Sequence, residues 1–224
     1  MGNYLDYLLF AVLPYVAVFT LLMVSIQRYR SQAFTFSSLS SQFLENKRHF
    51  WAMVPFHYGI LVVFVGHLIA FATPRSLLLW NSHPLRVAIL EVSALACGIL
   101  TLIGLIAMVA RRSNNSKLRV VTTPVDIVLY VMLILQVVLG IGVAVMYPWG
   151  SSWFAASLTP YLRSLFIMSP DISYVVNMPI MVKLHIINAF LVVGLFPFTR
   201  LVHILVVPNP YLWRKTQVVR WYRG

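Results

Sequence analysis

The chain has 224 residues, of which 60% are hydrophobic and only 10% are charged. A soluble domain usually carries about 25% charged residues, so the composition excludes an ordinary soluble protein and indicates one membrane bundle, residues 1–224, with no separate soluble domain. The net charge of +12 is attributed to the positive-inside bias of membrane proteins rather than to nucleic-acid binding, and the single cysteine, Cys97, excludes an internal disulfide or a cysteine-ligated cluster.

Long apolar runs predict the secondary structure, and each is long enough to cross a ~30 Å hydrocarbon layer as a helix. In chain order they cover about 4–26, 52–72, 87–110, 124–147 and 182–207. No alternating ten-residue pattern indicates a membrane barrel, so the expected fold is an all-α bundle of five transmembrane helices. The first run contains Asp6 and follows no basic residue, so it is predicted to be a span and not a cleaved signal. Pro197 predicts a kink in the fifth.

The basic residues are distributed unevenly among the connectors. Thirteen fall in the first connector, the third connector and the end of the chain, against four in the second and fourth connectors. This asymmetry predicts a multi-pass protein of the cell membrane with its amino terminus outside and its tail, 208–224, in the cytoplasm. The fourth connector, about 148–181, is long and apolar. It is either a helix lying in the outer interface or a loop packed over the bundle.

Four histidines lie in spans two and five, where ionisable groups are costly and usually functional. Because the two spans run in opposite directions, His57 shares the inner depth with His203, and His67 shares the outer depth with His185. Two facing imidazole pairs in apolar surroundings predict two b-type haems, one at each depth. Zinc or non-haem iron would require carboxylates or thiolates, and neither span contains an acidic residue. Structural or proton-relay histidines remain the alternative.

The spacing of these histidines differs between the two helices. The 18 residues from His185 to His203 make five complete turns and about 27 Å, whereas the ten residues on span two make about 15 Å. Helix tilt or staggered histidines would be needed to reconcile the two. Gly59 and Gly66 are expected to let a flat macrocycle approach span two. His83, in the second connector, is expected to be a surface residue.

Basic residues lie near the predicted inner haem. Haem propionates are anionic and pair well with arginine. Arg28, Arg112 and Arg200 are therefore propionate candidates, with Tyr29 beside Arg28 as a further one. The alternative is that these side chains only anchor the helices or meet lipid headgroups.

The histidines stand in recognisable phrases, and these extend over nearly the full length. The phrases are Phe56-His57-Tyr58-Gly59, Phe64-Val65-Gly66-His67, Thr122-Thr123-Pro124-Val125-Asp126-Ile127, Leu184-His185 and Phe196-Pro197-Phe198-Thr199-Arg200-Leu201-Val202-His203. The chain thereby resembles the gamma, or cytochrome b, subunit of membrane-bound respiratory nitrate reductase.

The resemblance implies a role in electron transfer. Such subunits oxidise quinol near the outer haem and pass electrons inward to an iron–sulfur beta subunit, which feeds a molybdenum-containing alpha subunit that reduces nitrate. The implied quinol pocket includes Gly66 and His67, with Arg86 where relatives carry a lysine. The chain itself would hold two haems b but no iron–sulfur cluster or molybdenum. Alternatives are the cytochrome b subunit of a heterodisulfide- or sulfite-reducing complex, or a non-haem transporter or assembly factor.

Overall fold

The computed structural model describes residues 4–32, 44 and 49–205, and the regular secondary structure of these residues is helical, without strands. Within these residues, five helical runs are long and apolar enough to cross a membrane. They are α1–η1–α2 (Tyr4–Tyr7, Leu8–Val12 and Leu13–Ser31), α3 (His49–Ala72), α5 (Pro84–Asn114), α7 (Pro124–Met146) and α11 (Ile180–Leu195), which continues as η4 (Phe196–Phe198). The predicted five-span, all-α membrane fold is confirmed. The predicted tail, 208–224, lies outside the described residues.

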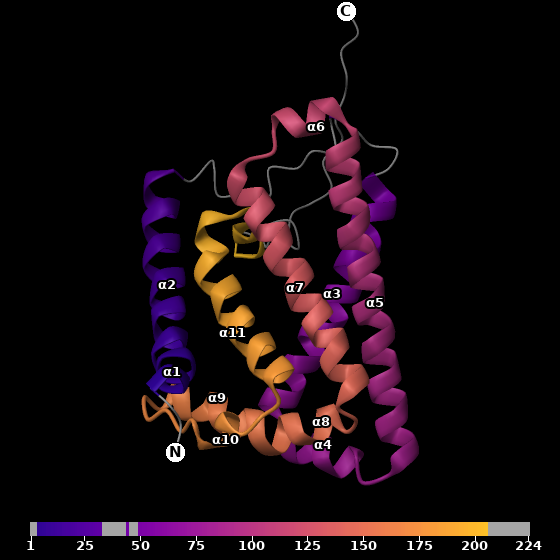
Figure 1. Cartoon of the computed structure of the whole chain (residues 1–224), viewed down its shortest axis with the longest axis vertical. Coiled ribbons are helices and arrows are strands. Elements are labelled where there is room, and N and C mark those ends of the chain that lie inside the picture. The colour runs from indigo at the N-terminus through magenta and orange to yellow at the C-terminus, as the bar shows by residue number, and fades with distance from the viewer. Residues whose placement is uncertain (1–3, 33–43, 45–48, 206–224) are drawn as a thin grey trace, which may run out of the picture.

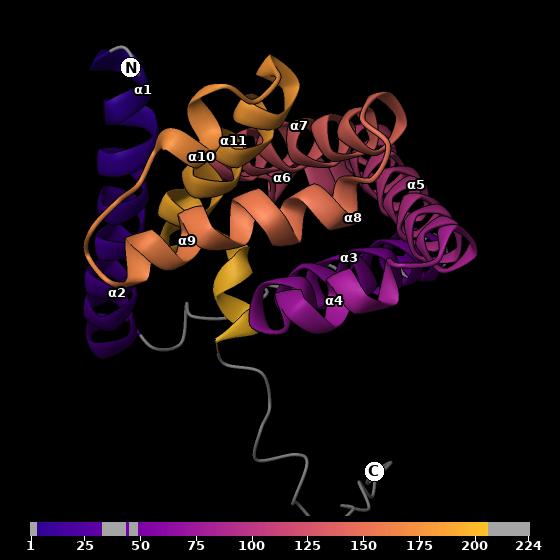
Figure 2. The same ribbon diagram turned by 90° about the horizontal axis from the view of Figure 1, so that it is seen from below.

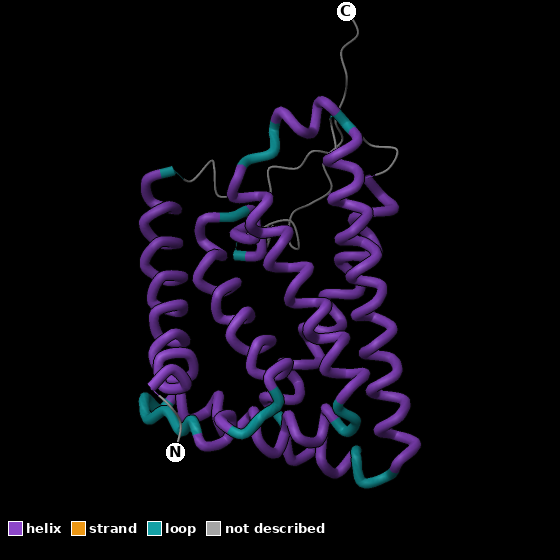
Figure 3. The backbone as a smooth tube through the Cα atoms, viewed as in Figure 1, coloured by secondary structure: helices purple, strands orange, loops and turns teal. Residues whose placement is uncertain are grey.

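The five long helices stand side by side, and short helices cover their two ends (Figures 1 and 3). The end that carries the amino terminus also holds α4 (Pro74–Trp80), α8 (Gly150–Trp153), η3 (Phe154–Leu158), α9 (Thr159–Phe166) and α10 (Ser173–Val176). The opposite end holds α6 (Ser116–Val120), with the basic side chains of Lys117 and Arg119. Within the described residues, the sparsely charged second and fourth connectors lie at one end of the molecule and the basic third connector at the other.

The fourth connector combines the two structures expected for it. From below, α8, η3 and α9 form a helical run that crosses the bundle end from α5 to α2 (Figure 2). The same run packs into the bundle, because Leu158 and Tyr161 are buried with Phe10 of the first span in one apolar cluster. The connector is therefore both a helix across the end of the bundle and a cover over it.

A buried hydrogen bond joins this cover to the first span. The Tyr161 hydroxyl of α9 donates to the carbonyl of Phe10, in the π-helical η1, at 2.7 Å. Burial raises the pKa of this hydroxyl, and the neighbouring Tyr15 raises it further, so Tyr161 remains a donor at neutral pH.

Glycines set the close packing of α3 on α5. A Cβ on Gly59 would lie 2.6 Å from the carbonyl oxygen of Cys97, and one on Gly104 would lie 2.5 Å from the backbone nitrogen of Phe56. Gly59 therefore faces α5 and serves helix packing, which corrects the expectation that it lets a macrocycle approach. Gly66 differs, because a Cβ there would meet nothing within 4 Å.

The fifth helix is shorter than the predicted range 182–207. The α-helix ends at Leu195, η4 carries Pro197, and Thr199 is fully extended at φ −112° and ψ −179°. A separate 3-10 turn, η5 (Arg200–Ile204), follows, with the Thr199 hydroxyl accepting from the N–H of Leu201. The kink expected at Pro197 is thus a complete break. His203 does not share a continuous helix with His185, so the five-turn argument for a common face does not apply.

Candidate functional site

The break in the fifth span brings the two predicted inner histidines together. After Thr199 the chain turns from α11 toward α3 (Figure 2), and the ring centroids of His57 and His203 lie 6.4 Å apart with their planes at 67°. A metal binds an imidazole nitrogen at about 2 Å, so two imidazoles on opposite sides of one metal place their centroids roughly 6 Å apart. The observed separation fits that arrangement. Because the helix breaks before His203, the spacing of about 27 Å expected from a continuous fifth helix does not apply.

All four candidate ligands have the same hydrogen-bond pattern at Nδ1. The Nδ1 atoms of His57 and His67 lie 2.8 Å from the carbonyls of Met53 and Val63, one turn earlier on α3. Nδ1 of His203 lies 2.6 Å from the carbonyl of Arg200. Nδ1 of His185 lies 3.1 Å from the carbonyl of Gln136, on α7.

A carbonyl can only accept, so each Nδ1 carries the proton and each Nε2 keeps its lone pair. This is how proteins prepare a histidine as a metal ligand. The inner pair, His57 and His203, fits the group, because two facing imidazole nitrogen donors are ligands that can hold a haem iron. For the outer candidates, His67 and His185, the structure shows the same hydrogen-bond pattern at Nδ1.

The two predicted outer ligands lie in different surroundings. The ring of His67 packs edge-on against Phe154 of η3, with centroids 5.5 Å apart. His185 lies against α7, where its Nε2 is 3.4 Å from the amide nitrogen of Gln136. His67 therefore borders the cover at the bundle end, and His185 borders a neighbouring span.

The basic candidates for propionate binding form protein contacts of their own. Arg200 binds Asp126 through two nitrogens, at 2.6 and 2.8 Å. Arg112 donates to the hydroxyls of Tyr130 and Thr122, both at 2.9 Å. Arg28 donates to the carbonyl of Pro197 at 2.7 Å, on the break before η5. Tyr29 is exposed. The three arginines thus lie in η5, contact the break before it, or flank the Asp126 carboxylate that binds Arg200.

The predicted quinol-side residues lie at the covered end of the bundle. Arg86 is exposed in the first turn of α5, and its guanidinium carbon is 5.4 Å from the centroid of the Trp80 ring. His83 precedes α5 and is exposed, in agreement with its expected surface position.

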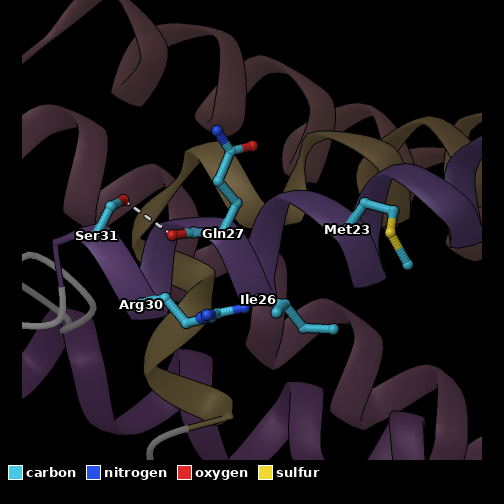
Figure 4. Close-up of a pocket in the computed structure, with 5 residues that line it drawn as sticks. All are labelled: Met23, Ile26, Gln27, Arg30 and Ser31. Atoms are coloured by element: carbon cyan, nitrogen blue, oxygen red, sulfur yellow. Dashed lines mark hydrogen bonds between the residues drawn. The ribbon is translucent and has the colours of Figure 1, made fainter.

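An open hollow elsewhere on the molecule is lined by residues of α2 and contains none of the candidate ligands (Figure 4). The lining residues are Met23, Ile26, Gln27, Arg30 and Ser31.

Four polar residues that the motif analysis left unassigned form hydrogen bonds around the candidate site. They are Glu91, Asp126, Gln136 and Asn188. A polar side chain inside an otherwise apolar span usually pairs with another helix, and that signal was present in the sequence for Gln136 and Asn188. For Asp126 the signal was the capping box Thr123-Pro124-Val125-Asp126, in which both reciprocal hydrogen bonds form.

Comparisons with known proteins agree on one family over almost the whole length. The family described as nitrate reductase gamma subunit matches residues 6–222. The respiratory nitrate reductase 2 gamma chain of Escherichia coli (strain K12) is 32% identical, over 98% of this chain and 99% of its own. The nitrate reductase gamma chain of Bacillus subtilis (strain 168) is 27% identical, over 95% and 97%. The nitrate reductase-like protein NarX of Mycobacterium tuberculosis (strain ATCC 25618 / H37Rv) is 30% identical, over 98% of this chain but 34% of its own.

Proposed function

This chain belongs to the nitrate reductase gamma subunit family, and we propose that it is the quinol-oxidising, dihaem membrane subunit of such a reductase. The observation that carries the proposal is the facing pair His57 and His203, 6.4 Å between ring centroids, with both Nδ1 atoms hydrogen-bonded to carbonyls. His57 and His203 would hold the inner haem, and His67 and His185 the outer one. When bound, the two haems would supply one-electron carriers between quinol and the partner subunit.

The residues of this chain would bind the quinol and send its electrons and its protons to opposite sides of the membrane. Quinol oxidation to quinone gives two electrons and two protons. The proposed pocket, with Gly66, His67 and Arg86, would lie at the end of the bundle covered by α8, η3 and α9. Arg86 can donate to a quinone oxygen but does not readily lose its own proton, so proton release would need another group or water. With the amino terminus outside, electrons would travel inward toward His57 and His203 while protons leave outside.

The relatives are named as gamma chains of nitrate reductases, which implies a complex with other subunits. The resemblance noted in the sequence implies an iron–sulfur beta subunit and a molybdenum-containing alpha subunit, and these are the proposed partners. They would dock on the end that carries α6, where basic side chains concentrate. Nitrate chemistry itself would take place on the alpha subunit.

The test is haem content and quinol reactivity of the complex purified through this chain. We expect two b haems per chain, reduction of both by a quinol, and reoxidation by nitrate when the partners are present. His67→Ala should remove one haem and quinol oxidation, whereas His83→Ala, at an exposed histidine, should change neither. A complex without b-type absorption, or a His67→Ala variant with both haems and full turnover, would overturn the proposal. If the subunits of a different reductase co-purify with this chain, the haem assignment would stand and the proposed reaction would change.

A further inference from the structure

The imidazole of His185 lies in a notch on the neighbouring span α7. A Cβ built on Gly140 would lie 3.0 Å from Cε1 of His185, and 3.6 and 3.7 Å from its two ring nitrogens. A contact at 3.0 Å is closer than side chains normally keep, so a Cβ at this position would require the ring to move by a few tenths of an ångström. Glycine inside a helix is less favourable than alanine. This packing contact provides a reason for glycine at the position.

The carbonyl one turn earlier completes the notch. Gln136 presents its backbone oxygen to Nδ1 of His185 at 3.1 Å. For the other three candidate ligands the corresponding carbonyl belongs to the ligand's own helix, at Met53, Val63 and Arg200. The protonation site of His185 is therefore set by a different helix from the one that carries it. The position of α11 against α7 must then be fixed accurately.

Asn188 supplies that fixation. It lies three residues after His185 on α11 and is 3% exposed. Its amide nitrogen donates to Oε1 of Gln136 at 2.7 Å and to the carbonyl of Met132 at 3.0 Å. A buried amide nitrogen without an acceptor is costly, so these two bonds favour one register of α11 on α7.

We propose that Gly140, Gln136 and Asn188 are positioning residues that seat His185 as the ligand of the outer haem. Gly140 provides the space, the Gln136 carbonyl holds the proton on Nδ1, and Asn188 holds the two helices in register. The proposal rests on the proposed function, since it concerns one of the two haems assigned there. None of the three residues contacts His57 or His203 in the interactions described above, so their influence should be confined to one haem.

The experiment compares Gly140→Ala with Gly98→Ala in the assembled complex. Both add a methyl group to a glycine in a membrane helix, but a Cβ on Gly98 would meet only Cγ1 of Ile141, at an ordinary 3.4 Å. Haem per chain and the midpoint potential of each haem are measured by redox titration followed optically. We expect Gly140→Ala to lose one of two haems, or to shift its potential alone, and Gly98→Ala to match the unmutated complex.

The retained haem serves as the internal control for folding. Two unchanged haems in Gly140→Ala, or equal loss of both, would overturn the notch as a positioning device. Asn188→Leu removes the interhelical bonds without filling the notch, and we expect it to keep both haems and shift the potential of the same one. An unchanged potential would contradict the role of Asn188. If the unmutated complex carries no b haem, the proposed function fails instead, so the two failures are distinguishable.

Discussion

Asp126 and Arg200 form a two-point ion pair that joins the first turn of α7 to the turn that carries His203. Nε and Nη2 of Arg200 lie 2.6 and 2.8 Å from the two carboxylate oxygens. The same carboxylate accepts the N–H of Thr123 at 2.9 Å and has Arg112 at 4.0 Å. The carbonyl of Arg200 in turn accepts the Nδ1 proton of His203 at 2.6 Å. The carboxylate therefore positions the proposed inner ligand through one intermediate residue.

Replacing Asp126 with Asn should loosen that inner ligand. Breaking a buried ion pair on one side costs roughly 3–5 kcal/mol, because the remaining charge loses its partner. Asp126 is nearly buried and Arg200 partly so, and we expect the lower end of that range. Thermal unfolding in detergent should show the loss of stability, and redox titration should show a shift or loss of one haem. Asp171→Asn, at an exposed carboxylate of the connector, is the control and should leave both haems unchanged.

The assignment of ligands in pairs predicts a specific pattern in double variants. His57→Ala and His203→Ala should each remove the same haem, so combining them should remove no more than either alone. His57→Ala combined with His67→Ala should remove both. Haem per chain, measured by the reduced-minus-oxidised spectrum, distinguishes the two results. If the double variant His57→Ala/His203→Ala lost both haems, the facing rings would not share one iron.

The composition of the chain was sufficient to predict the spans, and the direction of the helices was sufficient to predict the inner pair of rings. A membrane span needs an uninterrupted apolar run of ~20 residues, which is visible in any such sequence. The prediction of the fifth span was wrong at its carboxyl end, because an apolar sequence looks the same whether or not the helix continues. Pro197 indicated a kink, but the extended backbone at Thr199 depends on contacts from Arg28 and the capping of η5.

Helix faces were harder to predict than helix positions. Gly59 and Gly66 look equivalent in sequence, yet one packs against α5 and the other faces open space. The notch at Gly140 combines residues 45 positions apart along the chain, so no local pattern indicates it. Whether Arg28, Arg112 and Arg200 bind propionates stays a prediction, and their protein contacts show that each also has a structural role.

The carboxylate of Glu91 should hold the cover over the proposed quinol pocket. It accepts from the backbone N–H of Trp149 and Ser151, at 3.2 and 3.1 Å, and from the Ser151 hydroxyl at 2.9 Å. Hydrogen bonds to a charged acceptor contribute about 1.5–3 kcal/mol each. We expect Glu91→Ala to speed hydrogen exchange at residues 149–153 and to raise the KM for quinol more than it lowers kcat. The matched control is Glu91→Gln, which retains one acceptor oxygen and should show a smaller change. Equal exchange rates in all three proteins would contradict the role.

The hydroxyl of Tyr161 should stabilise the cover through its hydrogen bond to the first span. It is fully buried and donates to the carbonyl of Phe10 at 2.7 Å. Tyr161→Phe should therefore lower the free energy of unfolding by about 1–2 kcal/mol, because it removes a buried hydrogen bond. Tyr174→Phe, at an exposed tyrosine, measures the effect of losing a hydroxyl alone. Thermal unfolding in detergent measures both costs. Equal costs for the two variants would mean that the hydrogen bond of Tyr161 adds nothing to the stability of the cover.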